Sequence, residues 1–369
     1  MKRKKTLAIA LGAAVTLAAL TGCGGANSAA TQSAGGKPKV IIISKSYQNQ
    51  FYQAAFKGAQ DAADALGVSL TTNGPDAESN IPQQVEQLAS AVNQKPAAIA
   101  LAASDPNAVQ DTLAQAKSAG IPVIGFDSGV PGDTSGAVVA TAATDNEAAG
   151  ANVATNLIAN TDVQKALAAG TTEKPAVIGV LAQDSTSGSI VQRVNGFVKA
   201  AVAETEKLPG LAGSVDVSGQ EKWTKPSTSA AKVKVVVTVP PTTSQADIQA
   251  AATKTLTTDG LVSVFAANQD AVNGVISATG DATELNRETG KYKNLFVVGF
   301  DAGASQKAAV ASGAFLGSVT QDPYQMGYKA VELAVSASQG KTVANVDTGS
   351  HWYDKSNITD SKISILLYD

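Results

Sequence analysis

Two short segments of the sequence place an aspartate at the same relative position. Residues 123–129 read VIGFDSG and residues 297–303 read VVGFDAG, so Asp127 and Asp301 each follow an apolar run and precede a glycine. Apolar runs of this length, rich in valine and isoleucine, predict buried strands. A carboxylate at the end of a strand can accept hydrogen bonds from hydroxyl groups, cap the following segment or take part in acid–base chemistry.

The rest of the chain offers little support for catalysis. His351 is the only histidine, and no G-x-S-x-G motif is present. Residues 340–342 (GKT) resemble the end of a phosphate-binding loop, but Val335 stands where that motif requires glycine. No dinucleotide fingerprint follows a predicted strand, and no cysteine or histidine spacing indicates a metal. We therefore expect no catalytic residues, cofactor or metal, although two carboxylates flanking a sugar would also describe a glycosidase.

The composition predicts a globular protein with two domains. The chain has 369 residues, of which 44% are hydrophobic and 16% are charged. The net charge of −3 argues against a nucleic-acid-binding surface, which would be basic.

The N-terminal residues predict an export signal with a lipid anchor. A basic segment (residues 2–5) precedes a mainly apolar segment of 15 residues (6–20), which suits a signal peptide but is short for a membrane span. Residues 20–23 (LTGC) resemble a bacterial lipobox, and Cys23 is the only cysteine. We predict a signal peptide over 1–22, lipidation of Cys23 and a flexible tether over 23–37. The alternative is a chance cysteine after an ordinary secretory signal.

Strand and helix patterns alternate from residue 38 onward. The predicted strands are 40–43, 98–102, 123–126, 176–181, 234–237, 262–266 and 295–300, and amphipathic helices are predicted over 51–66, 81–92 and 108–119. Continuous apolar strands alternating with helices predict parallel sheets that are covered on both faces. We predict an α/β fold with two doubly wound lobes, one ending near Thr144 and the other starting near Lys174. The carboxyl ends of both sheets, with Asp127 and Asp301, would then face a shared cleft.

Seven segments, in this order, resemble the periplasmic-binding-protein-like sugar receptors of the ribose, galactose and xylose type, which serve ABC importers. The segments are SYQNQFYQAAFKGAQDAADALG (46–67), IPVIGFDSG (121–129), ATDNEAAG (143–150), QRVNGF (192–197), VFAANQDAVNGV (264–275), VVGFDAG (297–303) and TQDPYQMGYKAVE (320–332). The resemblance implies lobes of residues 38–144 with 322–347 and of residues 145–321 with 348–369, joined by a three-crossing hinge. Residues 203–231 do not fit the alternation, and we predict an irregular insertion there.

The resemblance also implies a set of ligand contacts. The matching positions are Asn49, Phe51, Tyr52, Asp127, Ser128, Asn268, Asp301, Gln321 and Arg193. Aromatic rings would stack on the C–H faces of a sugar, while carboxylates and amides would bind its hydroxyl groups.

Some of these positions have a second interpretation. Ser128 stands where the family usually has an arginine, which removes a forked donor. Arg193 matches a bracing position, so an ion pair within the protein and ligand contact both stay open. Phe51 could belong to the core, Asn268 could be a turn residue, and Asp270 fits a helix start better than a ligand contact.

The implied function is that of an extracytoplasmic substrate-binding lipoprotein. It would close around a monosaccharide or related polyol and deliver it to ABC permease subunits, as a monomer held at the cell membrane by lipidated Cys23. One alternative is a receptor that presents a sugar or furanose signal to a sensor kinase, and a more remote one is a carbohydrate-active enzyme. The signal peptide and the absence of a helix-turn-helix argue against a LacI-type repressor.

Overall fold

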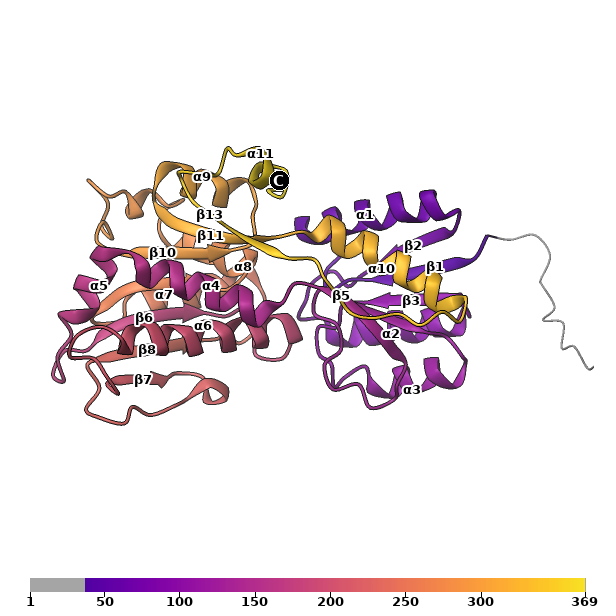
Figure 1. Ribbon diagram of the computed structural model, residues 1–369, viewed down its shortest axis with the longest axis horizontal. Coiled ribbons are helices and arrows are strands. Elements are labelled where there is room, and N and C mark those ends of the chain that lie inside the picture. Colours follow the sequence, from indigo (N-terminus) through magenta and orange to yellow (C-terminus); the bar gives the residue numbers. More distant parts are fainter. Residues whose placement is uncertain (1–36, 369) are drawn as a thin grey trace, which may run out of the picture. The chain divides into compact units, whose positions relative to one another are not determined.

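The computed structural model describes residues 37–368, so the predicted signal peptide, Cys23 and nearly all of the predicted tether lie outside the described residues. Two sheets organise this part of the chain (Figure 1). The first sheet contains β1 (Lys39–Ile43), β2 (Ser69–Asn73), β3 (Ala98–Leu101), β4 (Val123–Phe126), β5 (Val138–Ala143) and β12 (Val346–Asp347). Its strand order is β12-β5-β4-β3-β1-β2, and all recorded pairs are parallel.

The second sheet has seven strands in the order β13-β11-β10-β9-β6-β8-β7. They are β6 (Ala176–Leu181), β7 (Val215–Ser218), β8 (Val233–Thr238), β9 (Leu261–Ala266), β10 (Phe296–Phe300), β11 (Phe315–Gln321) and β13 (Ser350–Tyr353). Only β13 is antiparallel to its neighbour, β11. The predicted fold class, two α/β lobes with mainly parallel sheets, is confirmed.

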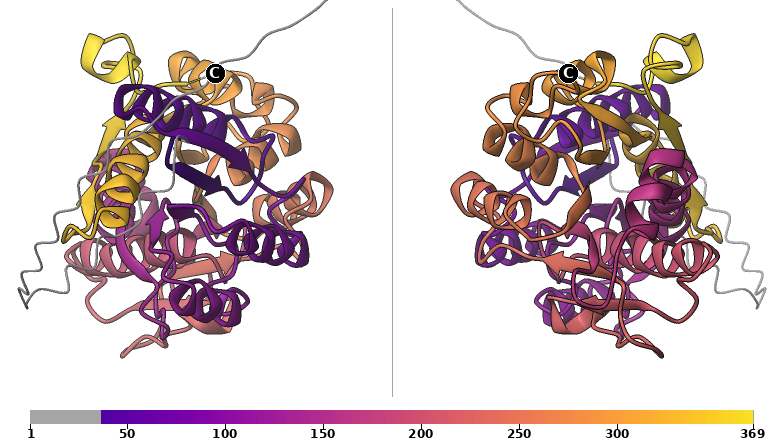
Figure 2. Two further views of the ribbon diagram at one scale, coloured as in Figure 1. Left: turned by 90° about the vertical axis from the view of Figure 1, so that its right-hand side faces the viewer. Right: turned by 90° about the vertical axis from the view of Figure 1, so that its left-hand side faces the viewer.

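Helices cover both faces of each sheet. The helices of the first lobe are α1 (Gln50–Leu66), α2 (Ile81–Asn93), α3 (Gln110–Ser118) and α10 (Pro323–Ser338). Those of the second lobe are α4 (Asn146–Ala159), α5 (Thr161–Ala168), α6 (Gly188–Glu206), α7 (Gln245–Leu256), α8 (Gln269–Ala278), α9 (Ala304–Ser312) and α11 (Ser361–Ser364), with 3-10 turns over Glu221–Trp223 and Thr283–Leu285. Figure 2 shows α1 and α10 on one side of the first sheet and α2 and α3 on the other. Each sheet therefore lies between two apolar clusters.

The chain passes between the two sheets three times. It leaves β5 for α4 at Thr144 and Asp145, leaves β11 for α10 at Asp322, and leaves β12 for β13 at Thr348 and Gly349. The crossings lie together, because the Thr144 hydroxyl donates to the Gly349 carbonyl at 3.0 Å and the Thr348 N–H donates to the Ala143 carbonyl at 3.0 Å. The lobes are thus joined by neighbouring segments, which is the arrangement that permits hinge motion.

The prediction of an irregular insertion over residues 203–231 is wrong for part of that segment. Helix α6 continues to Glu206, and β7 pairs in parallel with β8 at the edge of the second sheet. Trp223 is buried, and its indole N–H donates to the Asn195 side chain at 2.7 Å. The strand was missed because VDVS is short and half polar, as an edge strand exposed on one side can be.

A pair of closely packed helices in each lobe supports the elements that carry the site. In the first lobe α1 meets α10, and in the second α4 meets α6. Glycines allow these contacts: a side-chain carbon at Gly327 would overlap the Ala55 carbonyl, and one at Gly196 would overlap the Glu147 carbonyl. Backbone therefore contacts backbone directly in both pairs.

Gly327→Ala should destabilise the protein although alanine is the better helix former. The methyl group overlaps the backbone of α1, and overpacking of this kind costs about 1–3 kcal/mol. The midpoint of urea unfolding should fall. Lys329→Ala, which removes a partly exposed side chain from the same helix, should change stability by less than about 0.5 kcal/mol. An unchanged midpoint for Gly327→Ala would show that α1 and α10 can separate without loss.

Candidate functional site

The two aspartates of the repeated motif have the same backbone geometry. Asp127 follows β4 with φ of 51°, and Asp301 follows β10 with φ of 73°, so both lie in the left-handed region. The Asp127 N–H donates to the Ala142 carbonyl at 3.1 Å, and the Asp301 N–H donates to the Val319 carbonyl at 2.7 Å. Left-handed backbone is uncommon outside glycine and is tolerated by aspartate. The next strand thus holds each aspartate in a turn at the carboxyl end of its sheet.

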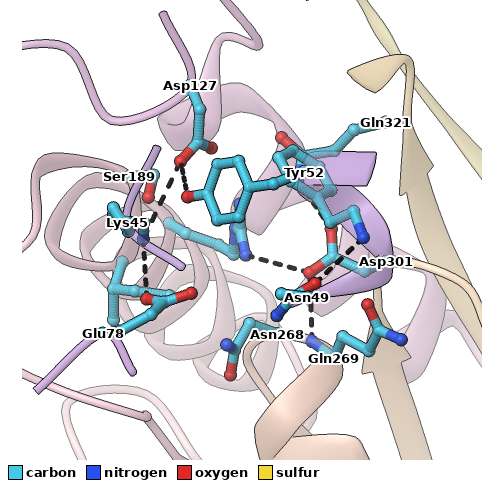
Figure 3. Close-up of a pocket in the computed structure, with 13 residues that line it drawn as sticks. Lys45, Asn49, Tyr52, Glu78, Asp127, Ser189, Asn268, Gln269, Asp301 and Gln321 are labelled. Atoms are coloured by element: carbon cyan, nitrogen blue, oxygen red, sulfur yellow. Dashed lines mark hydrogen bonds and ion pairs between the residues drawn. The ribbon is translucent and has the colours of Figure 1, made fainter. Parts of the chain in front are cut away.

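Both side chains line one cavity between the lobes (Figure 3). Asp127 and Asp301 are each 5% exposed. The cavity is lined by Lys45, Asn49, Phe51, Tyr52, Glu78, Asp127, Ser189, Ile190, Arg193, Asn268, Gln269, Asp301 and Gln321. Eight of the nine predicted site residues are in this set. The exception is Ser128, which lies beside Asp127 and contacts Ser189 of the opposite lobe.

Asp127 is the acceptor of the first lobe. Its Oδ2 atom accepts from the Tyr52 hydroxyl at 2.7 Å and from the Ser128 hydroxyl at 3.0 Å. Tyr52 is 2% exposed, and burial together with the Asp127 charge raises its pKa well above the usual value. The phenol is therefore a neutral donor at physiological pH. Figure 3 shows the Tyr52 ring lying between the two aspartates.

Lys45 and Glu78 form a buried ion pair that sequence analysis missed. The Lys45 ammonium lies 3.2 Å from Glu78 Oε2 and 3.8 Å from Asp127 Oδ2. Burial by itself lowers the pKa of Lys45, but the nearby carboxylates outweigh this effect and raise it. Burial raises the pKa of Glu78, and Lys45 opposes that rise. Lys45 could have been found, because it lies just beyond the carboxyl end of a predicted strand; Glu78 follows β2, which was not predicted.

Asp301 is the acceptor of the second lobe. Its Oδ1 atom accepts from the Gln321 amide at 2.6 Å, and its Oδ2 atom accepts from the Gln269 backbone N–H at 3.0 Å. Arg193 Nη1 lies 3.9 Å from Oδ2. Burial raises the pKa of Asp301, while Arg193 and these hydrogen bonds oppose the rise. Gln269 was another missed lining residue, although it directly follows the predicted Asn268.

Arg193 is held firmly by the protein itself. Its guanidinium donates to Asn146 Oδ1 at 2.8 and 3.2 Å and to the Ala267 carbonyl at 2.7 Å, and it stacks 3.5 Å from the centre of the Phe300 ring. The side chain is 2% exposed. These contacts fit the bracing interpretation, and Arg193 also lines the cavity.

Asn49, Phe51 and Asn268 each have a structural role as well as a place in the cavity wall. Asn49 caps α1 by accepting from the Phe51 N–H at 2.9 Å, and Asn268 caps α8 by accepting from the Ala271 N–H at 3.1 Å. Phe51 belongs to the core of the first lobe and meets Tyr52 edge-on at 5.1 Å. The core and cap interpretations are therefore present in the structure together with the cavity-lining positions.

Hydrogen bonds between the lobes hold the cavity closed. The Gln183 amide donates to Glu78 at 2.6 Å, and its oxygen accepts from Asn268. Gln269 donates to Gln50 at 3.0 Å, and the hydroxyls of Ser128 and Ser189 are 3.1 Å apart. The volume of the cavity is about 30 Å³, which is room for one or two water molecules. A larger cavity of about 290 Å³ lies beyond Glu78 and Gln183, between the same two lobes.

Two acceptors in the cavity wall lack a partner within residues 37–368. Gln321 Oε1 and Gln269 Oε1 are both buried without a recorded hydrogen bond. Because the Gln321 amide nitrogen donates to a carboxylate, its oxygen must be the free atom. Buried acceptors of this kind are usually paired, and a molecule in the cavity that carries hydroxyl or N–H groups would satisfy them. In the same part of the chain, no cluster of acidic, histidine or cysteine side chains could hold a metal ion.

Asp270→Asn should stabilise the protein at high pH. Burial, with Glu78 and Asp301, raises the pKa of Asp270 to about 7, against the opposing effect of Lys45. Since the native pKa lies above the unfolded one, the ionised side chain costs stability as the pH rises from about 4 through 7. In a fully buried group, a pKa shift of this size corresponds to about 4 kcal/mol. Solvent screening reduces the effect, so the variant should gain about half of that value, roughly 2 kcal/mol at pH 8. The gain should vanish below pH 4.

The melting temperatures of wild type and variant, measured between pH 4 and 8.5, test this expectation. Asp216→Asn, on the distant strand β7, is the matched control for replacing a carboxylate by an amide. A difference between Asp270→Asn and wild type that does not change with pH would contradict the assigned pKa.

Comparison with known proteins defines the class. A family model described as "Periplasmic binding protein domain" matches residues 40–342. The ribose import binding protein of Salmonella typhimurium is 26% identical over 307 residues, which cover 83% of this chain and 87% of the relative. This chain therefore belongs to the periplasmic binding protein domain family.

Solved structures show the same relationship. A protein of Brachyspira murdochii described as "ABC transporter, LacI family transcriptional regulator" is 35% identical with a TM-score of 0.73, covering 90% of this chain and 99% of that one. A solute-binding protein of Agrobacterium vitis with bound D-fucose is 28% identical with a TM-score of 0.71 (89% and 100% covered). One of Agrobacterium radiobacter in complex with D-arabinose is 27% identical with a TM-score of 0.70 (90% and 99% covered).

Proposed function

We propose that this chain is the substrate-binding lipoprotein of a sugar ABC importer. It binds a monosaccharide or related polyol between its lobes and delivers it to permease subunits, as a monomer outside the cytoplasm. The observation that carries the proposal is the convergence of Asp127 and Asp301, with amides from both lobes and aromatic rings from the first lobe, on one inter-lobe cavity. The family and its sugar-binding relatives support it.

The unpaired acceptors give the ligand its chemistry. Gln321 Oε1 and Gln269 Oε1 need donors, and the recorded hydrogen bonds of Asp127 within residues 37–368 all reach Oδ2, which leaves Oδ1 for a ligand hydroxyl. Two cations, Lys45 and Arg193, face three carboxylates, those of Asp127, Glu78 and Asp301, so each of these charges already has a partner of opposite sign within the protein. An uncharged molecule with several hydroxyl groups satisfies the acceptors without burying a new charge.

Binding requires the lobes to separate, because a sugar ring does not fit in about 30 Å³. Breaking the bond between Glu78 and Gln183 would join the closed cavity to the larger one beside it. A ligand that replaces the cross-lobe bonds with its own hydroxyl groups then stabilises the reclosed form by its greater affinity for it.

Among residues 37–368, no helix is sufficiently long and apolar to span a bilayer. Attachment to the membrane is proposed to be through lipidated Cys23 alone.

A panel of sugars tests the function directly. D-ribose, D-fucose, D-arabinose, D-tagatose and D-allose, each at 1 mM, should include at least one that raises the melting temperature, because a ligand that binds only the native state stabilises it. The bound sugar should be recovered chemically unchanged. Labelling of Cys23 by a fatty-acid analogue in cells, lost in Cys23→Ala, tests the anchor. Failure of these sugars and a wider polyol set to bind would overturn the proposed ligand class.

Asp127→Asn and Asp301→Asn should each weaken binding of that sugar by about 10- to 100-fold. A hydrogen bond to a carboxylate is worth about 1.5–3 kcal/mol, and the amide keeps the size of the side chain while losing the charge. Calorimetric titration measures the dissociation constant, and circular dichroism checks the fold. Asp216→Asn is again the control, with unchanged affinity. If both site variants bind as the wild type does, the carboxylates do not contact the ligand.

A further inference from the structure

The C-terminal segment Leu366–Tyr368 contacts both lobes at the edge of the cavity. Leu367 packs against the core of the second lobe, and the half-buried Tyr368 packs against the core of the first lobe. Adjacent residues therefore reach different lobes. Figure 1 shows this end of the described chain beside the N-terminal end of α1, which carries Phe51 and Tyr52.

The Tyr368 ring supports the aromatic wall of the cavity. It meets the Phe51 ring edge-on, with 6.1 Å between centroids and 76° between planes. Phe51 in turn meets Tyr52 edge-on, and Tyr52 donates to Asp127. Three rings thus form a continuous row from the C-terminal segment to the carboxylate of the first lobe. Edge-to-face pairs of this kind fix the orientation of a ring as well as burying it.

The polar contacts of the segment reach the second lobe beside its functional residues. The Ala302 N–H, one residue after Asp301, donates to the Tyr368 phenol oxygen at 3.3 Å. The Thr320 hydroxyl, one residue before Gln321, donates to the Leu366 carbonyl at 3.2 Å. Asp301 and Gln321 are themselves joined at 2.6 Å. The segment is therefore tied to the immediate neighbours of both residues that form the acceptor side of the second lobe.

We propose that Tyr368 is a positioning residue of the ligand site, which holds Phe51 of one lobe and the Asp301–Ala302 turn of the other in their closed arrangement. The proposal rests on the proposed function for its effect on sugar affinity. A site whose walls are already ordered loses less conformational entropy when the ligand binds. Tyr368 does not line the cavity and acts through Phe51 and Ala302.

The test compares Tyr368→Phe and Tyr368→Ala with the wild type. Phenylalanine keeps the ring contact but loses the hydrogen bond from Ala302, whereas alanine loses both. We expect the dissociation constant of the sugar that stabilises the wild type in the five-sugar panel to rise about 2- to 3-fold for Tyr368→Phe and about 10-fold for Tyr368→Ala. Tyr328→Ala is the matched control, because Tyr328 packs against the same core cluster and does not line the cavity.

A second measurement needs no ligand. Hydrogen exchange in the sugar-free protein should be faster at the Ala302 amide in both variants, and faster around Phe51 in Tyr368→Ala only. The control should leave both regions as in the wild type. A purely structural role would lower the melting temperature of Tyr368→Ala while leaving the sugar dissociation constant and these two exchange rates unchanged. That result would overturn the inference.

The two proposals can fail separately. If the wild type binds none of the sugars tested, the proposed ligand is wrong, and the exchange rates at Ala302 and Phe51 decide whether Tyr368 orders the two walls. If the wild type binds a sugar and Tyr368→Ala binds it with equal affinity, the function stands and the role of Tyr368 is overturned.

Discussion

The rest of the structure depends on two carboxylates that are buried at the ends of parallel strands. Asp127 and Asp301 are each fixed by a left-handed backbone turn and by a bond from the N–H to the neighbouring strand. Burial of a carboxylate is costly unless donors surround it. Tyr52, Ser128 and Lys45 supply them in the first lobe, and Gln321 and the Gln269 backbone N–H supply them in the second, with the guanidinium of Arg193 nearby. The polar wall of the cavity is the set of groups that these two acids require.

The same requirement underlies the proposal of an uncharged ligand. Lys45 is compensated by Glu78 and Asp127, and Arg193 is held by Asn146, by the Ala267 carbonyl and by the ring of Phe300. The charged groups are therefore paired with one another, and the cavity-wall acceptors without a recorded partner within residues 37–368 are the amide oxygens of Gln269 and Gln321 and Oδ1 of Asp127. Hydroxyl donors can satisfy these acceptors. A ligand with a net charge would have to disturb a buried ion pair, which is costly to break.

Closure of the lobes and the proposed binding involve the same residues. Glu78, Gln269 and Asn268 line the cavity and also take part in the network that closes it across the lobes. A molecule that takes over these bonds replaces protein contacts instead of adding to them, so its affinity is a difference between two sets of hydrogen bonds. The closely packed helix pairs, joined through glycine, keep each lobe rigid while the crossings at Thr144, Asp322 and Thr348 connect them.

The amino-acid pattern alone predicted the strands whose sequences are continuous apolar runs. The seven predicted strands are present, because most of them are buried on both faces and have few polar positions to obscure them. Strands β2, β5, β7, β11, β12 and β13 were not predicted. SLTTN and VDVS alternate or are polar because they lie at sheet edges, and β11 is interrupted by Gly317 and Ser318.

For the site, the repeated FD-x-G motif was enough to place Asp127 and Asp301 at strand ends, since that information is local. The family resemblance added Tyr52, Asn268 and Gln321. Lys45, Glu78, Gln269 and Tyr368 emerged only from the tertiary structure. Their significance depends on a partner far away in the chain: Glu78 matters because it lies 3.2 Å from Lys45 and accepts from Gln183 of the other lobe. Local sequence fixes where a chain turns and which faces are apolar, but pairings between distant segments are set by the packing of whole sheets and helices.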